Sequence, residues 1–196
     1  SIENSAHFID RHFFHLAHIL SRFAEKPMIA LKEDKVSSKK LFFPTRMFRD
    51  KKNLPPETVF SPAYNCDINL SAVDYTLAPG LEYSAAELQL RKLAIIQKDM
   101  FKYLINSDSD AMTFENIEKG KKRAINKGFP IRWIYMGLKN GLMVSYPGSG
   151  GLPADYDPRE RPWYKNAEGT HRQKWSNPYV DASGLGVIIS ASTALY

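Results

Sequence analysis

The stretch Tyr156-Asp-Pro-Arg-Glu-Arg-Pro-Trp-Tyr164 brings two arginines, two prolines and three large aromatic side chains into nine residues. Its planar, permanently charged Arg161 suits a carboxylate or a phosphate. Shortly after it, Trp175-Ser-Asn-Pro-Tyr-Val-Asp181 adds an anion. A cation, an anion and aromatic walls are typical of a site for a small zwitterion. A structural cluster of arginine and aromatic side chains that holds a loop fits the same spacing equally well.

Two β-prone runs precede this stretch, separated by the turn Lys139-Asn140-Gly141. Asn-Gly between such runs is a strong hairpin signal, so we expect a β-hairpin formed by residues 131–137 and 142–146. Further along, a short helix is expected over 161–168 and a buried strand over 187–192. A hairpin with one strand makes a thin antiparallel sheet, and further strands are therefore expected after Tyr196.

The beginning of the chain predicts a long amphipathic helix over residues 2–24. Its apolar residues recur four and three apart, the a/d pattern of a heptad: Ile2, Ala6, Ile9, Phe13, Leu16, Leu20 and Phe23. Such a helix packs along its own domain, and a homodimer through it is expected. Pro27 is expected to kink or interrupt the helix. The nearby histidines lack a carboxylate at matching spacing and are interpreted as polar flank residues, not metal ligands: His7, His12, His15 and His18.

The middle of the chain changes character twice. Between residues 41 and 83 turn formers are frequent and periodicity is poor, which predicts a long wrapping loop with short extended pieces near 60–66 and 70–77. Ser84 and Glu87 then form a capping-box pattern that predicts a helix running to Asn106. Another helix is expected to be capped by Asp110 or Thr113 and to close at Gly128, just before Pro130.

The composition fits one domain of good size, with 196 residues of which 43% are hydrophobic and 12% aromatic. No apolar run approaches the roughly 20 residues of a membrane span, and no signal-peptide pattern opens the chain. The net charge of +6 comes from local basic runs, expected to be solvated rather than to bind nucleic acid. The single Cys66 excludes an internal disulfide. Without a phosphate loop, metal-ligand spacing or nucleophile–base pair, neither an enzyme nor a cofactor is expected.

Together these motifs resemble a Cache sensor domain, and more narrowly the membrane-distal lobe of double Cache domains. The resemblance is carried by Trp133-Ile-Tyr-Met-Gly137, the Asn140-Gly141 turn, the 156–164 stretch, the motif ending at Asp181 and the hydrophobic strand after it. It implies an α+β fold in which a long N-terminal helix precedes a PAS-like lobe, an antiparallel β-sheet flanked by helices. The expected organisation is a signalling or dimerisation helix over 1–37, a wrapping loop or insertion over 38–82, and a ligand-binding lobe over 83–196, truncated at its C-terminal end.

The amino-acid-binding members of this family share a set of positions that this sequence matches in type and spacing. By resemblance, Tyr156, Arg161 and Trp163 hold the carboxylate of the ligand. By the same resemblance, Tyr164, Tyr179 and Asp181 surround its amine, and a further Asp of the amine site lies beyond Tyr196. Two hairpin side chains and the 147–153 loop are expected to tune specificity, the side chains being Tyr135 and Ser145. Arg159 is expected to point outward and to pair with solvent or Asp157.

The resemblance implies an extracytoplasmic, periplasmic or extracellular, sensor domain of a membrane-anchored receptor of the chemoreceptor, histidine kinase or cyclase type. Its ligand is expected to be a small amine-bearing carboxylate, in the first place an amino acid. The motifs are also similar to the Cache region of calcium-channel accessory subunits. The alternative function is therefore a structural or protein-interaction module that binds no small molecule.

Overall fold

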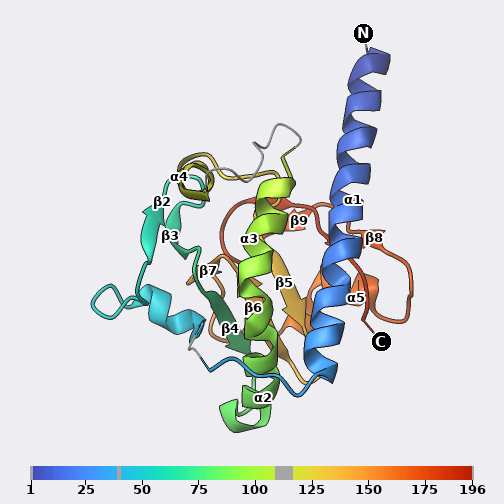
Figure 1. The fold of residues 1–196 in the computed structure, drawn as a ribbon. Helices are drawn as coiled ribbons and strands as arrows, with labels where there is room; N and C mark the ends of the chain where they lie inside the picture. Colours follow the sequence, from blue (N-terminus) through green and yellow to red (C-terminus); the bar gives the residue numbers. More distant parts are fainter. Residues whose placement is uncertain (1, 39–40, 109–116, 196) are drawn as a thin grey trace.

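A mixed four-stranded sheet forms the centre of the computed structural model, which describes residues 2–38, 41–108 and 117–195, apart from the side chains of residues 2–8. The strands run in the order β1 (Phe42–Pro44), β4 (Val73–Leu77), β6 (Leu142–Tyr146) and β5 (Ile134–Gly137). β1 is parallel to β4, and the other neighbours are antiparallel. The fold is α+β, with an N-terminal helix followed by antiparallel sheets flanked by helices, consistent with a PAS-like lobe (Figure 1).

The hairpin β5–β6 confirms the prediction from Asn140-Gly141. Gly141 takes a φ of +94°, which side chains other than glycine adopt only with strain. The Asn140 side-chain oxygen accepts a hydrogen bond from the Leu142 amide at 3.1 Å and so fixes the turn. The hairpin register places Tyr135 directly opposite Ser145.

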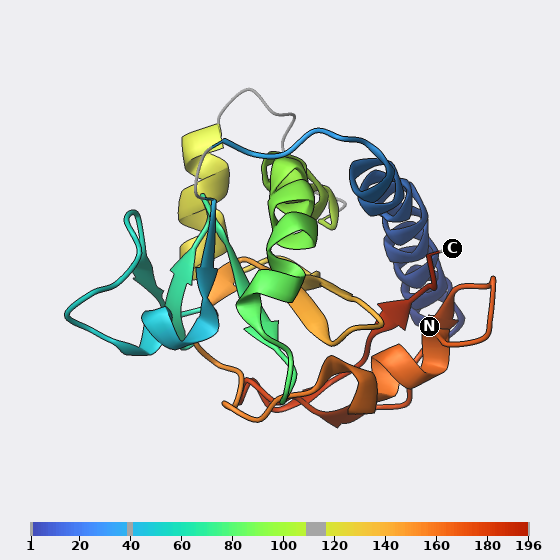
Figure 2. The same cartoon turned by 90° about the horizontal axis from the view of Figure 1, so that it is seen from below.

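Each strand of this hairpin sends alternate side chains to opposite faces of the sheet. Leu142, Val144 and Tyr146 lie in the main hydrophobic core, whereas Met143 belongs to a second, smaller cluster. Helices cover the first face, and the chain after β6, including α5, lies against the other (Figure 2). The second face, which also carries Tyr135 and Ser145, is the one on which the candidate site forms.

The N-terminal helix α1 runs without a break from Ile2 to Lys32, so the expected interruption at Pro27 is wrong. A proline removes one helical hydrogen bond, but here Pro27 is buried between Phe23 and Ala30 on the face that packs against the lobe. The buried face of α1 thus continues on both sides of the proline. The first turns of α1 extend past the rest of the described chain (Figure 1), and Ile9 and Phe14 are exposed there.

The helical middle of the chain is divided differently from the prediction. α2 (Tyr83–Leu93) and α3 (Gln97–Asn106) are joined by the 3-10 turn η2 (Ala94–Ile96). Ser84 is not the N-cap, because α2 begins one residue earlier and Glu82 holds the extended cap backbone, with φ −82° and ψ 146°. α4 (Ile117–Asn126) closes at Gly128 as predicted, with φ +69°; the expected caps Asp110 and Thr113 lie outside the described residues.

Segment 41–82 corrects the sequence interpretation, since it supplies part of the sheet rather than a loop laid over it. β1 and the 3-10 helix η1 (Thr45–Arg49) open it, and β4 occupies an interior position between β1 and β6. The expected extended pieces are present as β2 (Val59–Ser61), β3 (Cys66–Asn69) and β4. β2 and β3 form a separate sheet with β7 (Gly148–Ser149).

The predicted buried strand over 187–192 is also wrong. The segment forms two short pieces, β10 (Val187–Ile188), paired with β9 (Tyr179–Val180), and β11 (Ala191–Ser192), paired with β8 (Lys174–Trp175). Gly184 and Gly186, both with positive φ, turn the chain back on β9 and leave Val187 71% exposed. Among the described residues, no helix combines the length and apolar character that a bilayer crossing requires.

Candidate functional site

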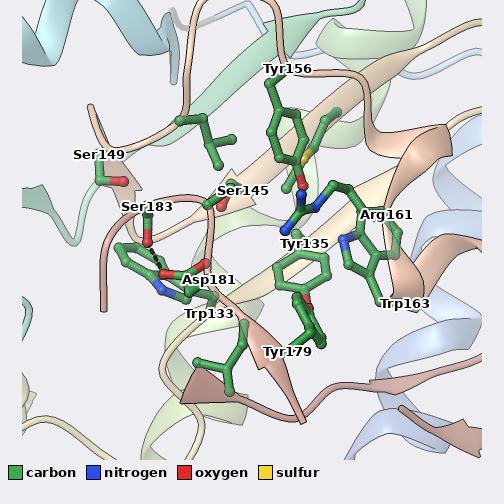
Figure 3. Close-up of a pocket in the computed structure, with 14 residues that line it drawn as sticks. Trp133, Tyr135, Ser145, Ser149, Tyr156, Arg161, Trp163, Tyr179, Asp181 and Ser183 are labelled. Carbon is green, nitrogen blue, oxygen red and sulfur yellow. Dashed lines mark hydrogen bonds between the residues drawn. The ribbon is translucent and has the colours of Figure 1, made fainter. Parts of the chain in front are cut away.

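A small cavity lies between the second face of the sheet and the loops that follow β6 (Figure 3). Its volume is about 30 Å³. Side chains from β5 and the residue before it, from β6, from the 149–163 segment and from the 179–188 segment converge on it: Trp133, Tyr135, Met143, Ser145, Ser149, Leu152, Tyr156, Arg161, Trp163, Tyr179, Asp181, Ala182, Ser183 and Ile188.

The local structure of the 156–164 stretch explains why its two arginines differ. Asp157 caps the 3-10 helix η3 (Pro158–Glu160) by accepting a hydrogen bond from the Arg159 amide, and its carboxylate also pairs with the Arg159 guanidinium at 2.6 Å. This confirms the predicted outward pairing of Arg159. Arg161 then takes an extended backbone, with φ −86° and ψ 148°, and serves as the N-cap of α5 (Pro162–Ala167). Its side chain faces the cavity instead.

The Arg161 guanidinium lies between two aromatic rings. Its Cζ is 5.7 Å from the ring centroid of Tyr156 and 5.7 Å from that of Tyr179, in range for cation–π contact. One nitrogen, Nη2, donates a hydrogen bond to the Val180 carbonyl at 3.1 Å. No ion pair of Arg161 occurs within the described part of the chain. The guanidinium therefore retains donors for an anionic group.

The Asp181 carboxylate faces the same cavity from the turn after β9. Its Oδ2 accepts hydrogen bonds from the Ser183 hydroxyl and from the Leu185 amide, the latter at 3.3 Å. Like Arg161, Asp181 makes no ion pair with another described side chain. The cavity thus holds one positive and one negative side chain, each without an opposite charge of its own.

Two tyrosines of the cavity, Tyr156 and Tyr135, are neutral over the physiological range because their pKa values are raised. Burial raises the pKa of Tyr156 to about 12, an effect partly opposed by a hydrogen bond with Trp163 and by the charge of Arg161. Burial likewise raises the pKa of Tyr135 well above its usual value of 10.0. The two phenols therefore remain protonated, so their hydroxyl groups can donate to an anionic ligand group or accept from an ammonium.

Two of the tyrosines that line the cavity, Tyr135 and Tyr179, form a cluster of three hydroxyl groups with Ser190. The Ser190 hydroxyl lies 2.5 Å from that of Tyr135 and 2.7 Å from that of Tyr179, and the two tyrosine oxygens are 3.3 Å apart. The Tyr179 hydroxyl is therefore engaged with Ser190 and Tyr135, while its ring faces Arg161.

Most of the residues predicted for the site come together in the cavity: Tyr135, Ser145, Tyr156, Arg161, Trp163, Tyr179 and Asp181. Tyr164 is not among the lining residues. Its ring packs edge-on against Trp163, with centroids 5.7 Å apart, close to Gly137 of β5. The sequence interpretation overlooked Trp133 and Ser183. The alternation of the strand was a usable signal for Trp133, because it lies two residues before Tyr135 and hence on the same face.

A second, larger cavity of about 390 Å³ separates α1 from β5 and from residues 188–191. It shares the side chains of Trp133, Tyr135 and Ile188 with the first, but its lining is mostly apolar and brings no pair of opposite charges together. No group of three or more His, Cys, Asp or Glu side chains in the described ranges is arranged to hold a metal ion. We therefore take the smaller cavity as the candidate site.

Comparison with known proteins connects part of this chain to bacterial chemoreceptors. No family model matches it. It is 41% identical over 59 residues to the methyl-accepting chemotaxis protein PscA of Pseudomonas syringae pv. tomato, which is 30% of this chain and 9% of the relative. It is 40% identical over 66 residues to McpC of Bacillus subtilis, which is 33% of this chain and 10% of McpC. It is 39% identical over 54 residues to PctB of Pseudomonas aeruginosa, which is 28% of this chain and 8% of PctB. Part of the chain is thus similar to methyl-accepting chemotaxis proteins, and the chain spans about a tenth of the length of these relatives.

Proposed function

We propose that this chain is the ligand-binding sensor domain of a membrane-anchored signalling receptor of the chemoreceptor type. We further propose that it is a double Cache lobe on the extracytoplasmic side of the membrane and that it binds an amino acid or a related amine-bearing carboxylate. The observation that carries the proposal is the convergence on one cavity of Arg161 and Asp181, neither of which forms an ion pair with a described side chain. Similarity to chemotaxis proteins supports the receptor part.

The ligand class follows from the chemistry of the two charged groups. A guanidinium binds a carboxylate through paired N–H donors. A carboxylate surrounded by aromatic faces suits an ammonium group. In Figure 3, Arg161, Tyr156 and Trp163 lie on one side of the cavity and Asp181 lies on the other. A zwitterion spanning the two sides would neutralise both charges at once, whereas a simple anion or cation would leave one unpaired.

The cavity of about 30 Å³ holds roughly two waters, which is less than an amino acid needs. Ligand entry therefore requires the turn between Asp181 and Gly186 to move outward and then close. A Cβ built at Gly184 or at Gly186 would meet no atom within 4 Å, so these two positions of the turn face open space, whereas Ser183 lies close to Gly151. We propose that closure is passed through the 188–192 segment to α1 and from there to the rest of the receptor. The homodimer through α1 stays a prediction.

Thermal unfolding with each of the twenty amino acids tests the binding proposal. A ligand at a hundred times its dissociation constant stabilises a protein by about 2.7 kcal/mol, which raises the melting temperature by several degrees. We expect this shift for one class of amino acid, and its loss in Arg161→Ala and in Asp181→Ala. Arg159→Ala is the matched control, because it removes an arginine of the same loop that points away from the cavity.

The structural alternative predicts a different pattern. If the site only holds the fold together, no amino acid shifts the wild-type melting temperature, and Arg161→Ala lowers that temperature in the absence of any ligand. The hydrogen bond from Arg161 to the Val180 carbonyl is the contact whose loss would produce this effect. Arg161→Lys, which keeps the charge, separates a loss of binding from a loss of structure.

A further inference from the structure

The charge content of the cavity restricts the side chain of the ligand. Among the described residues that line it, only Arg161 and Asp181 carry a charge. The carboxylate and the ammonium of an amino acid use both. A charged ligand side chain would then be enclosed without an opposite charge, and an unpaired charge away from water costs several kcal/mol.

The indole N–H of Trp133 is a buried donor that lacks an acceptor. Its Nε1 is shielded from solvent and has no hydrogen-bond partner in the described part of the chain. The ring is held in place by an edge-on contact with Tyr64, with centroids 4.9 Å apart. An indole nitrogen only donates, and leaving such a donor unsatisfied costs about 1–3 kcal/mol. Because this atom is not accessible from the closed cavity, an acceptor brought by the ligand reaches and satisfies it only after the site opens.

The surroundings of Trp133 narrow the ligand class further. Trp133, Asp181 and Ser183 lie on the same side of the cavity, opposite Arg161 (Figure 3). A ligand whose ammonium meets Asp181 therefore directs its side chain into a region with polar groups. Ser145 and Ser149 also line this cavity, and the outward movement that the site needs in order to admit an amino acid is smallest for a short side chain.

Resting on the proposed amino-acid site, we propose that the ligand is a small, uncharged amino acid whose side chain carries a hydrogen-bond acceptor. The Trp133 N–H is the group that selects it. A ligand with an acceptor pairs a donor that is unpaired in the free protein and gains affinity, whereas an analogue without the acceptor leaves the donor as it was and gains nothing from it. Serine, threonine and asparagine satisfy these requirements, whereas aspartate, lysine and arginine do not.

Isothermal titration with two pairs of nearly isosteric amino acids tests the proposal. L-Threonine and L-valine differ by a hydroxyl, and L-asparagine and L-aspartate differ by a charge. We expect threonine to bind about threefold to tenfold more tightly than valine, the worth of one neutral hydrogen bond. We expect asparagine to exceed aspartate by at least about a hundredfold, because the additional carboxylate is unpaired.

Trp133→Phe removes the N–H and keeps an aromatic ring. In this variant the ratio of threonine to valine affinity should fall to about one while valine binding is retained, which also shows that the variant folds. A ratio that survives the substitution, or a wild-type ratio near one, overturns the role of Trp133. Should the variant not fold, the indole ¹H–¹⁵N resonance of Trp133 in the wild type gives the answer: it must shift downfield with threonine and not with valine.

The failure of this inference is distinct from failure of the proposed function. Binding of aspartate or lysine as tight as that of asparagine overturns the uncharged class while the amino-acid site stands. Absence of binding by any of the twenty amino acids overturns the site itself and this inference with it. Binding that Arg161→Ala leaves unchanged also overturns the site.

Discussion

The ring of Phe13 on α1 meets the indole of Trp175 edge-on, with the two centroids 4.8 Å apart. Trp175 pairs with Ala191 across β8 and β11. The next residue, Ser176, exchanges hydrogen bonds with Ser190, whose hydroxyl contacts the cavity tyrosines Tyr135 and Tyr179. A short series of direct contacts therefore connects the candidate site to α1, the helix through which we propose that closure of the site is passed on.

The Phe13–Trp175 contact should be measurable as an interaction energy. A double-mutant cycle of Phe13→Ala and Trp175→Ala, followed by urea unfolding, is expected to give a coupling of about 0.5–1.5 kcal/mol, the range of aromatic pairs. Phe14 is the matched control: it is 77% exposed on the same helix, and its cycle with Trp175→Ala should give a coupling near zero. Equal couplings for Phe13 and Phe14 would show that α1 is not docked through this contact.

Removal of the hydroxyl should change the free energy of unfolding differently at two buried serines, Ser190 and Ser192. Ser190→Ala deprives Tyr135 and Tyr179 of a shared partner and is expected to lower the free energy of unfolding by about 1–3 kcal/mol. The Ser192 hydroxyl is buried and has no hydrogen-bond partner among the described residues, so Ser192→Ala should be neutral or slightly stabilising. Urea unfolding of both variants provides the measurement. Comparable losses in the two would contradict the assigned role of the hydroxyl cluster.

Gly151 controls how closely the 147–153 loop approaches the turn that carries Asp181. A Cβ at this position would lie 2.5 Å from the Cβ of Ser183 and 3.0 Å from its Cα. Gly151→Ala is therefore expected to cost about 1–3 kcal/mol through overpacking, and to weaken amino-acid binding because Asp181 is displaced. Adding Ser183→Gly removes the closest contact and should restore part of the stability. If the double variant is no more stable than Gly151→Ala, the clash lies elsewhere.

The parts of the fold that could be predicted from the sequence are those fixed by local chemistry. Asn140-Gly141 specifies its turn through a positive φ and a side-chain hydrogen bond, and Gly128 ends α4 in the same manner. The residues that the family resemblance assigns to the ligand carboxylate, Tyr156, Arg161 and Trp163, lie within one stretch of nine residues, and Asp157 caps the 3-10 helix that leads into Arg161. These signals act over a few residues and need no tertiary context.

The errors arise where tertiary contacts decide the outcome. β4 has buried residues on successive positions, Val73 and Asp74, so it lacks the alternation by which a half-exposed strand is recognised. The hydrophobic run 187–192 is held near the surface by pairing with β9 and β8, which no local pattern reveals. Tyr164 packs on its neighbour Trp163 and lies outside the cavity, beside Gly137. Gly137 is far from Tyr164 in sequence, so this contact could not be foreseen locally.

Asp74 should make the stability of the fold depend on pH. Its fully buried carboxylate accepts hydrogen bonds from the Thr45 hydroxyl at 2.7 Å and from the Ser149 amide at 3.1 Å. Burial raises its pKa from 3.8 to about 7, although these two hydrogen bonds act in the opposite direction. The folded protein therefore holds a proton between about pH 4 and pH 7 that the unfolded chain has released.

Because the folded state binds the additional proton, the free energy of unfolding is highest at the acidic end of that window and falls as the pH rises towards 7. Above pH 7 the stabilisation that comes from the bound proton is lost completely, which lowers the free energy of unfolding by on the order of 4 kcal/mol for this one group. Asp74→Asn, which is uncharged at every pH, should flatten this slope and be more stable than the wild type at pH 8. Urea unfolding at several values between pH 4.5 and pH 8 measures the slope. The exposed Asp155, changed to Asn, is the matched control and should leave the slope unaltered. If the slope persists in Asp74→Asn, another group must titrate in this range. The Asp74 carboxylate would then be charged in the folded protein throughout the range.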